Sequence, residues 1–238
     1  MPAALCIDAG VIEPTSLRIR NLALNKKGAC RFVHFTDFHF KGDVNYAAEM
    51  VESINDLAPQ FVCFTGDLVE DKAFAAAALA FITQIKAPVY GVPGNHDFWS
   101  RAPFADYERA FAKTGGAWLV DRTVVLDQHG IEIVGMGRGG LRACGPARLP
   151  RQILLVHYPC TADQLEGRRF ELILAGHSHG GQVRLPFYGP VILPWGVGRY
   201  DLGFFETAGG PLYVNPGIGF YEIPVRFNCR PELTVVTI

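Results

Sequence analysis

Short runs of apolar, β-prone residues alternate with helical patterns through the first half of the chain. The apolar runs cover residues 31–36, 61–64 and 88–91. Between them, residues 45–57 and 73–85 place alanines and large aliphatic side chains at helical spacing. This alternation predicts βαβ units with parallel strands, and therefore an α/β fold.

The second half of the chain is richer in β patterns. Residues 123–126 and 131–134 flank a turn and predict a hairpin, and residues 152–156 and 171–174 are continuous apolar runs typical of central strands. Residues 183–185, 212–214 and 233–238 complete the expected strands. Together the two halves predict two packed sheets with helices outside. No repeat or low-complexity linker interrupts the chain, so residues 1–238 are expected to form a single domain.

Composition excludes several classes of protein. A net charge of -1, with 49% hydrophobic residues, argues against a nucleic-acid binder and against a disordered chain. The six cysteines form no C-x-x-C pair and indicate reduced thiols of a cytosolic protein. Neither a signal peptide nor an apolar run of about 18 residues is present, so no transmembrane segment is expected. The expected location is cytoplasmic, or peripheral to the inner membrane.

Five polar segments stand out because each follows a predicted strand. They are Asp37-Phe-His39, Gly66-Asp67, Gly94-Asn-His-Asp97, His157 and Gly176-His-Ser-His179. Each segment alone has an ordinary structural explanation, such as a turn, a helix cap or a buried core histidine. Ligand-binding loops gather at strand ends in α/β sheets, so the five segments in this order predict one shared site.

The residue types suit two divalent metal ions. Ions about 3.5–4 Å apart can clamp a displacement at phosphorus, and one carboxylate must then bridge them. A mixed set of carboxylate, amide and imidazole ligands favours Mn, Fe, Zn or Co over Ca, and we expect Mn first. With two carboxylates and a hydroxide, such a site remains cationic and attracts a phosphate ester.

In this order, the five segments resemble the calcineurin-like metallophosphoesterase family, and most closely its bacterial phosphodiesterase branch. The resemblance extends from about residue 13 to residue 238 and includes Gly176-His-Ser-His-Gly-Gly-Gln-Val183 and Leu212-Tyr-Val-Asn-Pro-Gly217. It implies a four-layer α-β-β-α sandwich of two mixed sheets flanked by helices. It is specific for the metal site and much less specific for the substrate.

The resemblance also implies a role for each residue. Asp37, His39 and His179 would hold the first metal, Asn95, His157 and His177 the second, and Asp67 would bridge them. His96 would be the general acid that protonates the leaving group, oriented by Glu70, while Asn95 would also contact the substrate. Asp97 is interpreted as a turn-stabilising group and not as a ligand.

Two loops are expected to determine the substrate. Residues 135–150 are compact and basic, and Arg138 and Arg142 either lie in a solvated connection or grip a phosphate. Residues 185–205 are rich in aromatic side chains and either pack a small core of their own or cap the site for a lipid-linked or aromatic ester.

The function expected first is hydrolysis of phosphodiesters by metal-bound hydroxide, with His96 as the acid. A narrower alternative is a UDP-2,3-diacylglucosamine pyrophosphatase of lipid A synthesis, and a phosphomonoesterase would use the same metals. The competing class is a non-catalytic scaffold, which the complete set of candidate ligands disfavours. The oligomeric state is not indicated by the sequence.

Overall fold

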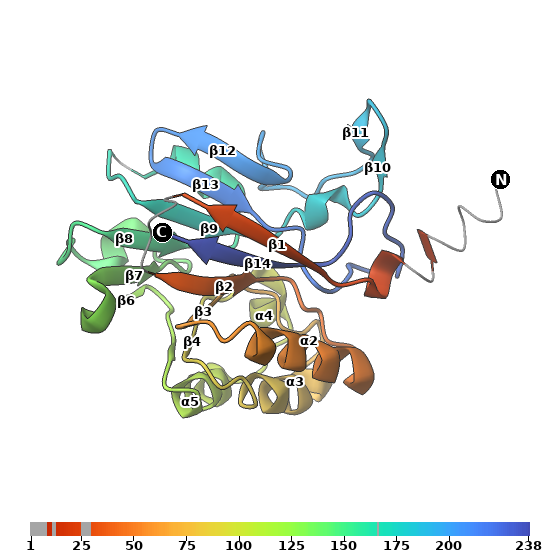
Figure 1. Ribbon diagram of the computed structural model, residues 1–238, viewed down its shortest axis with the longest axis horizontal. Helices are drawn as coiled ribbons and strands as arrows, with labels where there is room; N and C mark the ends of the chain where they lie inside the picture. The colour runs from red at the N-terminus through yellow and green to blue at the C-terminus, as the bar shows by residue number, and fades with distance from the viewer. Residues whose placement is uncertain (1–8, 11–12, 25–29, 166) are drawn as a thin grey trace.

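A computed structural model describes residues 9–10, 13–24, 30–165 and 167–238. The N-terminal residues 1–8, including Cys6, lie outside the described residues, as does any conclusion about a signal peptide there. Two six-stranded sheets pack face to face, with the long helices on one side (Figure 1). The α/β fold with two mixed sheets and helices is therefore confirmed.

The first sheet contains the strands that precede the N-terminal candidate ligands. In spatial order it consists of β1 (Arg18–Ala23), β14 (Glu232–Thr237), β2 (Arg31–Phe35), β3 (Val62–Phe64), β4 (Val89–Gly91) and β5 (Ala117–Trp118). The strands β2 to β5 are parallel, as the alternation predicted. Strand β14 lies between β1 and β2, parallel to the first and antiparallel to the second.

The second sheet contains the strands that precede the histidine segments. Its spatial order is β12 (Gly203–Thr207), β13 (Gly210–Val214), β9 (Leu172–Ala175), β8 (Gln152–Leu155), β7 (Ile131–Gly135) and β6 (Arg122–Leu126). The central strands β13, β9, β8 and β7 are parallel, and the antiparallel pairs β12–β13 and β6–β7 form the two edges. The β6–β7 pair is the predicted hairpin.

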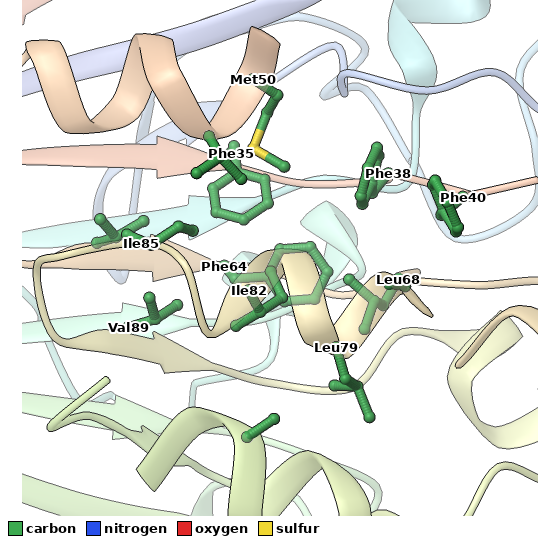
Figure 2. Close-up of a cluster of buried hydrophobic side chains, with 14 of the residues drawn as sticks. Phe35, Phe38, Phe40, Met50, Phe64, Leu68, Leu79, Ile82, Ile85 and Val89 are labelled. Atoms are coloured by element: carbon green, nitrogen blue, oxygen red, sulfur yellow. The ribbon is translucent and has the colours of Figure 1, made fainter. Parts of the chain in front are cut away.

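Helices α2 (Val44–Asp56), α3 (Ala75–Ile82) and α5 (Phe104–Lys113) cover the outer face of the first sheet (Figure 1). Helix α2 begins where the Asp43 carboxylate accepts the Tyr46 amide proton, and its buried face carries Met50 and Ile54. Figure 2 shows Met50 packed with Phe35 of β2 in this layer. The helices thus hold the strand ends that carry the site.

A second apolar layer lies between the sheets, and a third covers the outer face of the second sheet. In the described residues, that outer face is covered by short 3-10 segments, Leu141–Cys144 and Pro159–Asp163, and not by long helices. The fourth layer of the sandwich is therefore thin. The loops around Asn95, His157 and His177, the residues expected to hold the second metal, therefore lie close to the surface.

Several elements differ from the sequence-based expectation. The strand expected at residues 183–185 is β10 (Arg184–Leu185), which pairs only with β11 (Gly189–Pro190) in a separate hairpin. Strands β1, β5 and β12 and helices α4 (Asn95–Trp99) and α5 were not predicted. The five described cysteines are free thiols. None of the helices in the described ranges is long and apolar enough to span a bilayer.

Candidate metal centre

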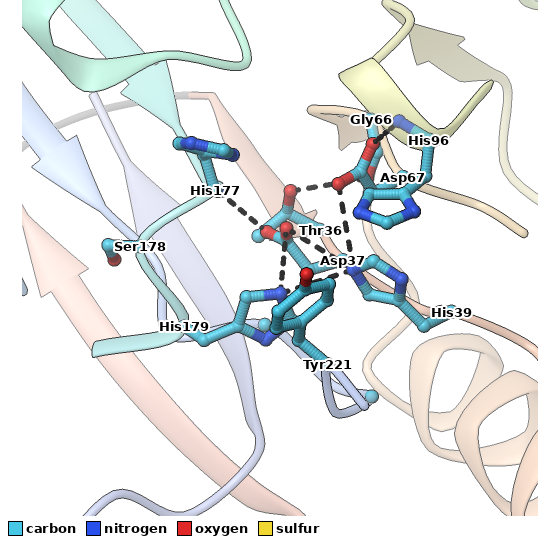
Figure 3. Close-up of polar contacts among 12 residues, drawn as sticks. Thr36, Asp37, His39, Gly66, Asp67, His96, His177, Ser178, His179 and Tyr221 are labelled. Carbon is cyan, nitrogen blue, oxygen red and sulfur yellow. Dashed lines mark hydrogen bonds and ion pairs between the residues drawn. The ribbon is translucent and has the colours of Figure 1, made fainter. Parts of the chain in front are cut away.

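The predicted polar segments meet at the carboxyl ends of parallel strands from both sheets (Figure 3). In the first sheet, β2 leads to Asp37 and His39, β3 leads to Asp67, and β4 leads to Asn95. In the second sheet, β8 leads to His157, and β9 leads to His177 and His179. All seven side chains belong to buried residues. The structure therefore brings together residues as distant in sequence as His39 and His179, which are 140 positions apart.

Three side chains form the first group of possible ligands. The Nε2 atoms of His39 and His179 lie 3.1 Å apart, and they lie 3.8 and 3.4 Å from Oδ1 of Asp37. That Asp37 oxygen is buried and has no hydrogen-bond partner among the described residues. Such an unsatisfied carboxylate oxygen, facing two imidazole nitrogens, fits a cation.

A second group surrounds His157. Its Nε2 lies 3.0 Å from Oδ1 of Asn95, 3.1 Å from Nδ1 of His177 and 3.2 Å from Oδ2 of Asp67. The same Asp67 oxygen lies 3.6 Å from Nε2 of His39 in the first group. Asp67 therefore stands between the two groups, in the position that a bridging carboxylate requires.

The contacts on the far side of each imidazole favour metal binding. Nδ1 of His157 donates to the carbonyl of Thr65 at 2.7 Å, and Nε2 of His177 donates to the carbonyl of Trp195 at 2.7 Å. A carbonyl can only accept, so the proton of a neutral ring is fixed on the outer nitrogen and the inner nitrogen keeps its lone pair. This is the tautomer that a metal ligand needs.

Each group contains one histidine with a raised pKa and one with a lowered pKa. Burial opposes protonation of His39 and His157, but the neighbouring carboxylates outweigh it and raise the pKa of each to about 9. Burial and the charge of His157 lower the pKa of His177 to about 4, and burial lowers the pKa of His179 well below its usual value. Burial disfavours ionised Asp67, yet His157 lowers its pKa to about 2.

Five of the seven side chains are carried by a left-handed backbone. The φ angles of Asp37, His39, Asp67, His177 and His179 lie between 44° and 68°. This region costs non-glycine residues about 1 kcal/mol or more each, so the surrounding structure must enforce it. It does so through paired turns, because the amides of Asp37 and His39 donate to the carbonyls of Gly66 and Asp67 at 2.8 and 3.0 Å.

Asp97 fixes the turn that carries Asp67 and does not face the ligand atoms. Its carboxylate accepts the amide protons of Asp67, Leu68 and Gly94 at 2.8, 3.0 and 2.8 Å, and the hydroxyl of Tyr107 donates to it at 3.1 Å. Burial and the charge of Asp67 raise the pKa of Asp97 to about 6. The expected turn-stabilising role of Asp97 is confirmed.

His96 lies beside the first group, and together with His39 and Asp67 it forms a further set of side chains close enough to hold a metal ion. Its ring centroid lies 4.8 Å from that of His39 and 5.6 Å from that of Tyr221, which covers this side of the site (Figure 3). The His96 amide donates to Oδ1 of Asp67 at 2.8 Å. Burial lowers the pKa of His96. Its ring is partly exposed.

Glu70 contacts a different histidine from the one expected. Its Oε1 lies 3.1 Å from Nδ1 of His39 and 3.2 Å from Nζ of Lys41, so it faces the outer nitrogen of a possible ligand and not His96. The His96 ring instead packs edge-on against Trp99 and Tyr221. Residues 36–40 run alongside residues 66–68 and are hydrogen-bonded to them. This pairing brings Glu70 next to His39 and not next to His96.

The two arginines of the basic loop separate in the structure. Arg138 lines a cavity together with Asn95 and His157. Arg142 lines another cavity, with Leu165 and Arg168, that contains none of the possible ligands. Residues 185–205 are only partly a loop, since they include the β10–β11 hairpin and the beginning of β12.

Some contacts of the site left no signal in the sequence. Thr65 and Trp195 act through their carbonyl oxygens, which every residue possesses. Tyr221 packs beside His39 and His179, and it follows the Asn-Pro-Gly motif that resembles the family. That motif does not itself indicate that a nearby tyrosine reaches the site.

Comparison with known proteins agrees with this geometry. Residues 30–181 match the calcineurin-like phosphoesterase family. The uncharacterized metallophosphoesterase YkuE of Bacillus subtilis is 31% identical over 98% of this chain and 87% of its own length. The phosphodiesterase YaeI of Escherichia coli is also 31% identical, over 63% of this chain and 58% of its own. The solved structure of an archaeal phosphodiesterase aligns over 79% of this chain and 84% of that one, with a TM-score of 0.44 and 10% identity.

Proposed function

We propose that this chain, which belongs to the calcineurin-like phosphoesterase family, hydrolyses phosphodiesters with the help of two divalent metal ions. The observation that carries the proposal is the convergence of the imidazole nitrogens. The outer nitrogens of His157 and His177 face carbonyl oxygens, and their inner nitrogens lie 3.1 Å apart beside Asp67. Buried imidazoles that gather around shared carboxylates, with inner nitrogens facing one another, are the arrangement that holds metal cations in proteins.

The proposed ligand sets follow the two groups of side chains. Asp37, His39 and His179 would hold one ion, and Asn95, His157 and His177 would hold the other. Asp67 would bridge them, because its Oδ2 faces both groups. The ligand types are compatible with manganese, which we propose first, and with iron, zinc or cobalt.

When bound, the ions supply Lewis-acid chemistry, lowering the pKa of water and neutralising phosphoryl charge. The protein contributes the remaining steps through its own side chains. His96 would carry the proton that the leaving alkoxide receives, since its partly exposed ring lies beside His39 and Asp67. The amide of Asn95 would orient a phosphoryl oxygen, and Glu70 would keep His39 aligned through Nδ1.

A preference for diesters is supported by one relative, because YaeI bears the name phosphodiesterase. The same side chains would also serve a phosphomonoesterase. Rates on bis-(para-nitrophenyl) phosphate and on para-nitrophenyl phosphate, compared at equal manganese, separate the two activities. A higher kcat/KM on the monoester would overturn the diester preference while leaving the metal chemistry intact.

The metal-dependent activity is tested by Asp67→Ala. We expect this variant to lose activity on the diester and to bind fewer manganese ions by elemental analysis, because both groups lose a carboxylate. The matched control is Asp106→Ala, which removes an exposed carboxylate of helix α5. Full activity in the metal-free protein, or an Asp67→Ala variant as active as the control, would contradict the proposal.

A second candidate is a lipid-linked substrate, and an exposed apolar surface favours it. Around the β10–β11 hairpin, Phe187, Tyr188, Ile192 and Trp195 are largely exposed. The surface adjoins the site, because the Trp195 carbonyl accepts a hydrogen bond from Nε2 of His177. Release of UMP from detergent-dispersed UDP-2,3-diacylglucosamine would support this candidate, together with a location at the membrane surface. Equal hydrolysis of acylated and unacylated esters would argue against it.

A further inference from the structure

Arg138 lies in a cavity that opens beside the second group of ligands. The cavity is lined by Asn95 and His157 from that group, and by Phe98, Arg138, Tyr158 and Thr161 from outside it. No aspartate or glutamate lines this cavity. A ligand held at Asn95 and His157 could therefore extend into it and meet a cation with no competing anion.

The segment around Arg138 is held in place by the Asp121 carboxylate. Asp121 accepts the amide proton of Gly137 with Oδ1 at 2.8 Å and that of Gly139 with Oδ2 at 2.9 Å. A Cβ at Gly139 would lie 2.7 Å from Oδ2 of Asp121, and one at Gly137 would lie 3.2 Å from the same atom, so a larger residue at Gly139 would displace this carboxylate and one at Gly137 would crowd it. The two hydrogen bonds fix the backbone on each side of Arg138 and so fix where its side chain begins.

The guanidinium of Arg138 is positioned by an aromatic ring. Its Cζ lies 3.9 Å from the centroid of Phe98, on the helix α4 that begins at Asn95. Within the described part of the chain, no carboxylate lies within ion-pair distance of this guanidinium. Stacking occupies the face of the group and leaves the N–H donors at its edge available, which is the arrangement that binds an oxyanion.

We propose that Arg138 binds a second anionic group of the substrate, a phosphate or a carboxylate attached next to the phosphate that is cleaved. The inference rests on the proposed function, which places the cleaved phosphate between the two groups of ligands. It narrows the substrate class to esters with two neighbouring negative groups, diphosphate diesters among them. Arg138 is then a specificity-determining residue that favours these esters over a diester carrying a single charge.

Binding of non-hydrolysable probes tests this without turnover. The probes are methylenediphosphonate, phosphonoacetate and methylphosphonate, titrated calorimetrically into manganese-loaded protein from which free metal has been removed. We expect the two probes with a second anionic group to bind more tightly than methylphosphonate. Arg138→Ala should reduce this preference about ten- to hundredfold, the usual effect of losing a charge-assisted pair of hydrogen bonds. The two probes show whether phosphate or carboxylate is preferred.

The matched control is Arg148→Ala, which removes an exposed arginine of the same loop that does not line the cavity. A preference that survives in Arg138→Ala, or that falls equally in the control, would overturn the inference. Kinetics give an independent readout, in which Arg138→Ala should lower kcat/KM more on a diphosphate diester than on bis-(para-nitrophenyl) phosphate. An equal loss on both substrates would also overturn it.

The two proposals fail in different ways. A wild-type protein that binds the probes through Arg138 but hydrolyses no ester would refute the proposed function alone. A protein that hydrolyses the simple diester in an Asp67-dependent manner, but whose probe preference ignores Arg138, would refute only the inference about the cavity.

Discussion

Binding of manganese to the metal-free protein should release protons, because two of the imidazoles are protonated at neutral pH. Burial disfavours the charged ring of His39, but Asp37, Glu70 and Asp67 together raise its pKa to about 9. His157 also reaches about 9, through Asp67 and Asp37. Other possible ligands already have the protonation state that binds a metal, since burial keeps His177 and His179 neutral and Asp67 is ionised. A ligand nitrogen must lose its proton before it binds a cation.

The size of the effect follows from the two raised values. At pH 7, a ring with a pKa of about 9 is almost fully protonated, and its deprotonation costs about 3 kcal/mol. Two rings together therefore oppose metal binding by about 5 kcal/mol at this pH. Loading both groups should release about two protons, to which any ionising water adds. The overall affinity should rise about a hundredfold per pH unit between pH 6.5 and 8.

Calorimetric titration in buffers of different ionisation enthalpy counts the released protons. Glu70→Gln is the informative variant, because it removes one carboxylate beside His39 and should reduce proton release at pH 8. Its matched control is Glu108→Gln, an exposed carboxylate on helix α5. Proton release near zero at pH 7, or an affinity independent of pH, would show that the carboxylates do not hold His39 and His157 in the charged form.

The remaining predictions concern the protein without metal. Asp97→Asn should lower the free energy of unfolding by about 2 kcal/mol in urea, since an amide cannot accept all the bonds that Asp97 accepts from Asp67, Leu68, Gly94 and Tyr107; an effect no larger than that of exposed Asp106→Asn would contradict it. In the presence of a chelator, stability should fall between pH 6.5 and 9, because the raised pKa values of His39 and His157 stabilise the folded state below 6.5 and that contribution disappears as pH rises through about 9. Urea midpoints unchanged across this range would contradict it.

Most of the site could be predicted because each group of ligands follows an apolar strand. The strands before Asp37, Asp67 and His157 are short and mostly apolar, which favours buried strands in an α/β chain. The order of the polar segments was therefore sufficient to predict that they share one edge of the structure. The positions of the helices before β3 and β4 followed from the same alternation.

The parts that could not be predicted depend on contacts between distant segments. The left-handed backbone at Asp37 and Asp67 contradicts local preference and is imposed by hydrogen bonds between their two turns. Glu70 reaches His39 because those turns run side by side, which spacing along the chain does not reveal. The separation of Arg138 from Arg142 likewise depends on how the Asp121 carboxylate holds one end of the basic loop.

The place of β14 in the first sheet has a consequence for how the protein is made. This strand follows every other described strand along the chain, yet it lies between β1 and β2 and pairs with both. While the ribosome is still producing the earlier strands, β1 has no described neighbour and β2 has one edge open. The pairing of β1 with this sheet can therefore form only after β14 has been synthesised. The turn after β2, which carries Asp37, is then completed late, because the amides of Ile218 and Gly219 donate to the carbonyls of Thr36 and Asp37 at 3.0 and 2.8 Å.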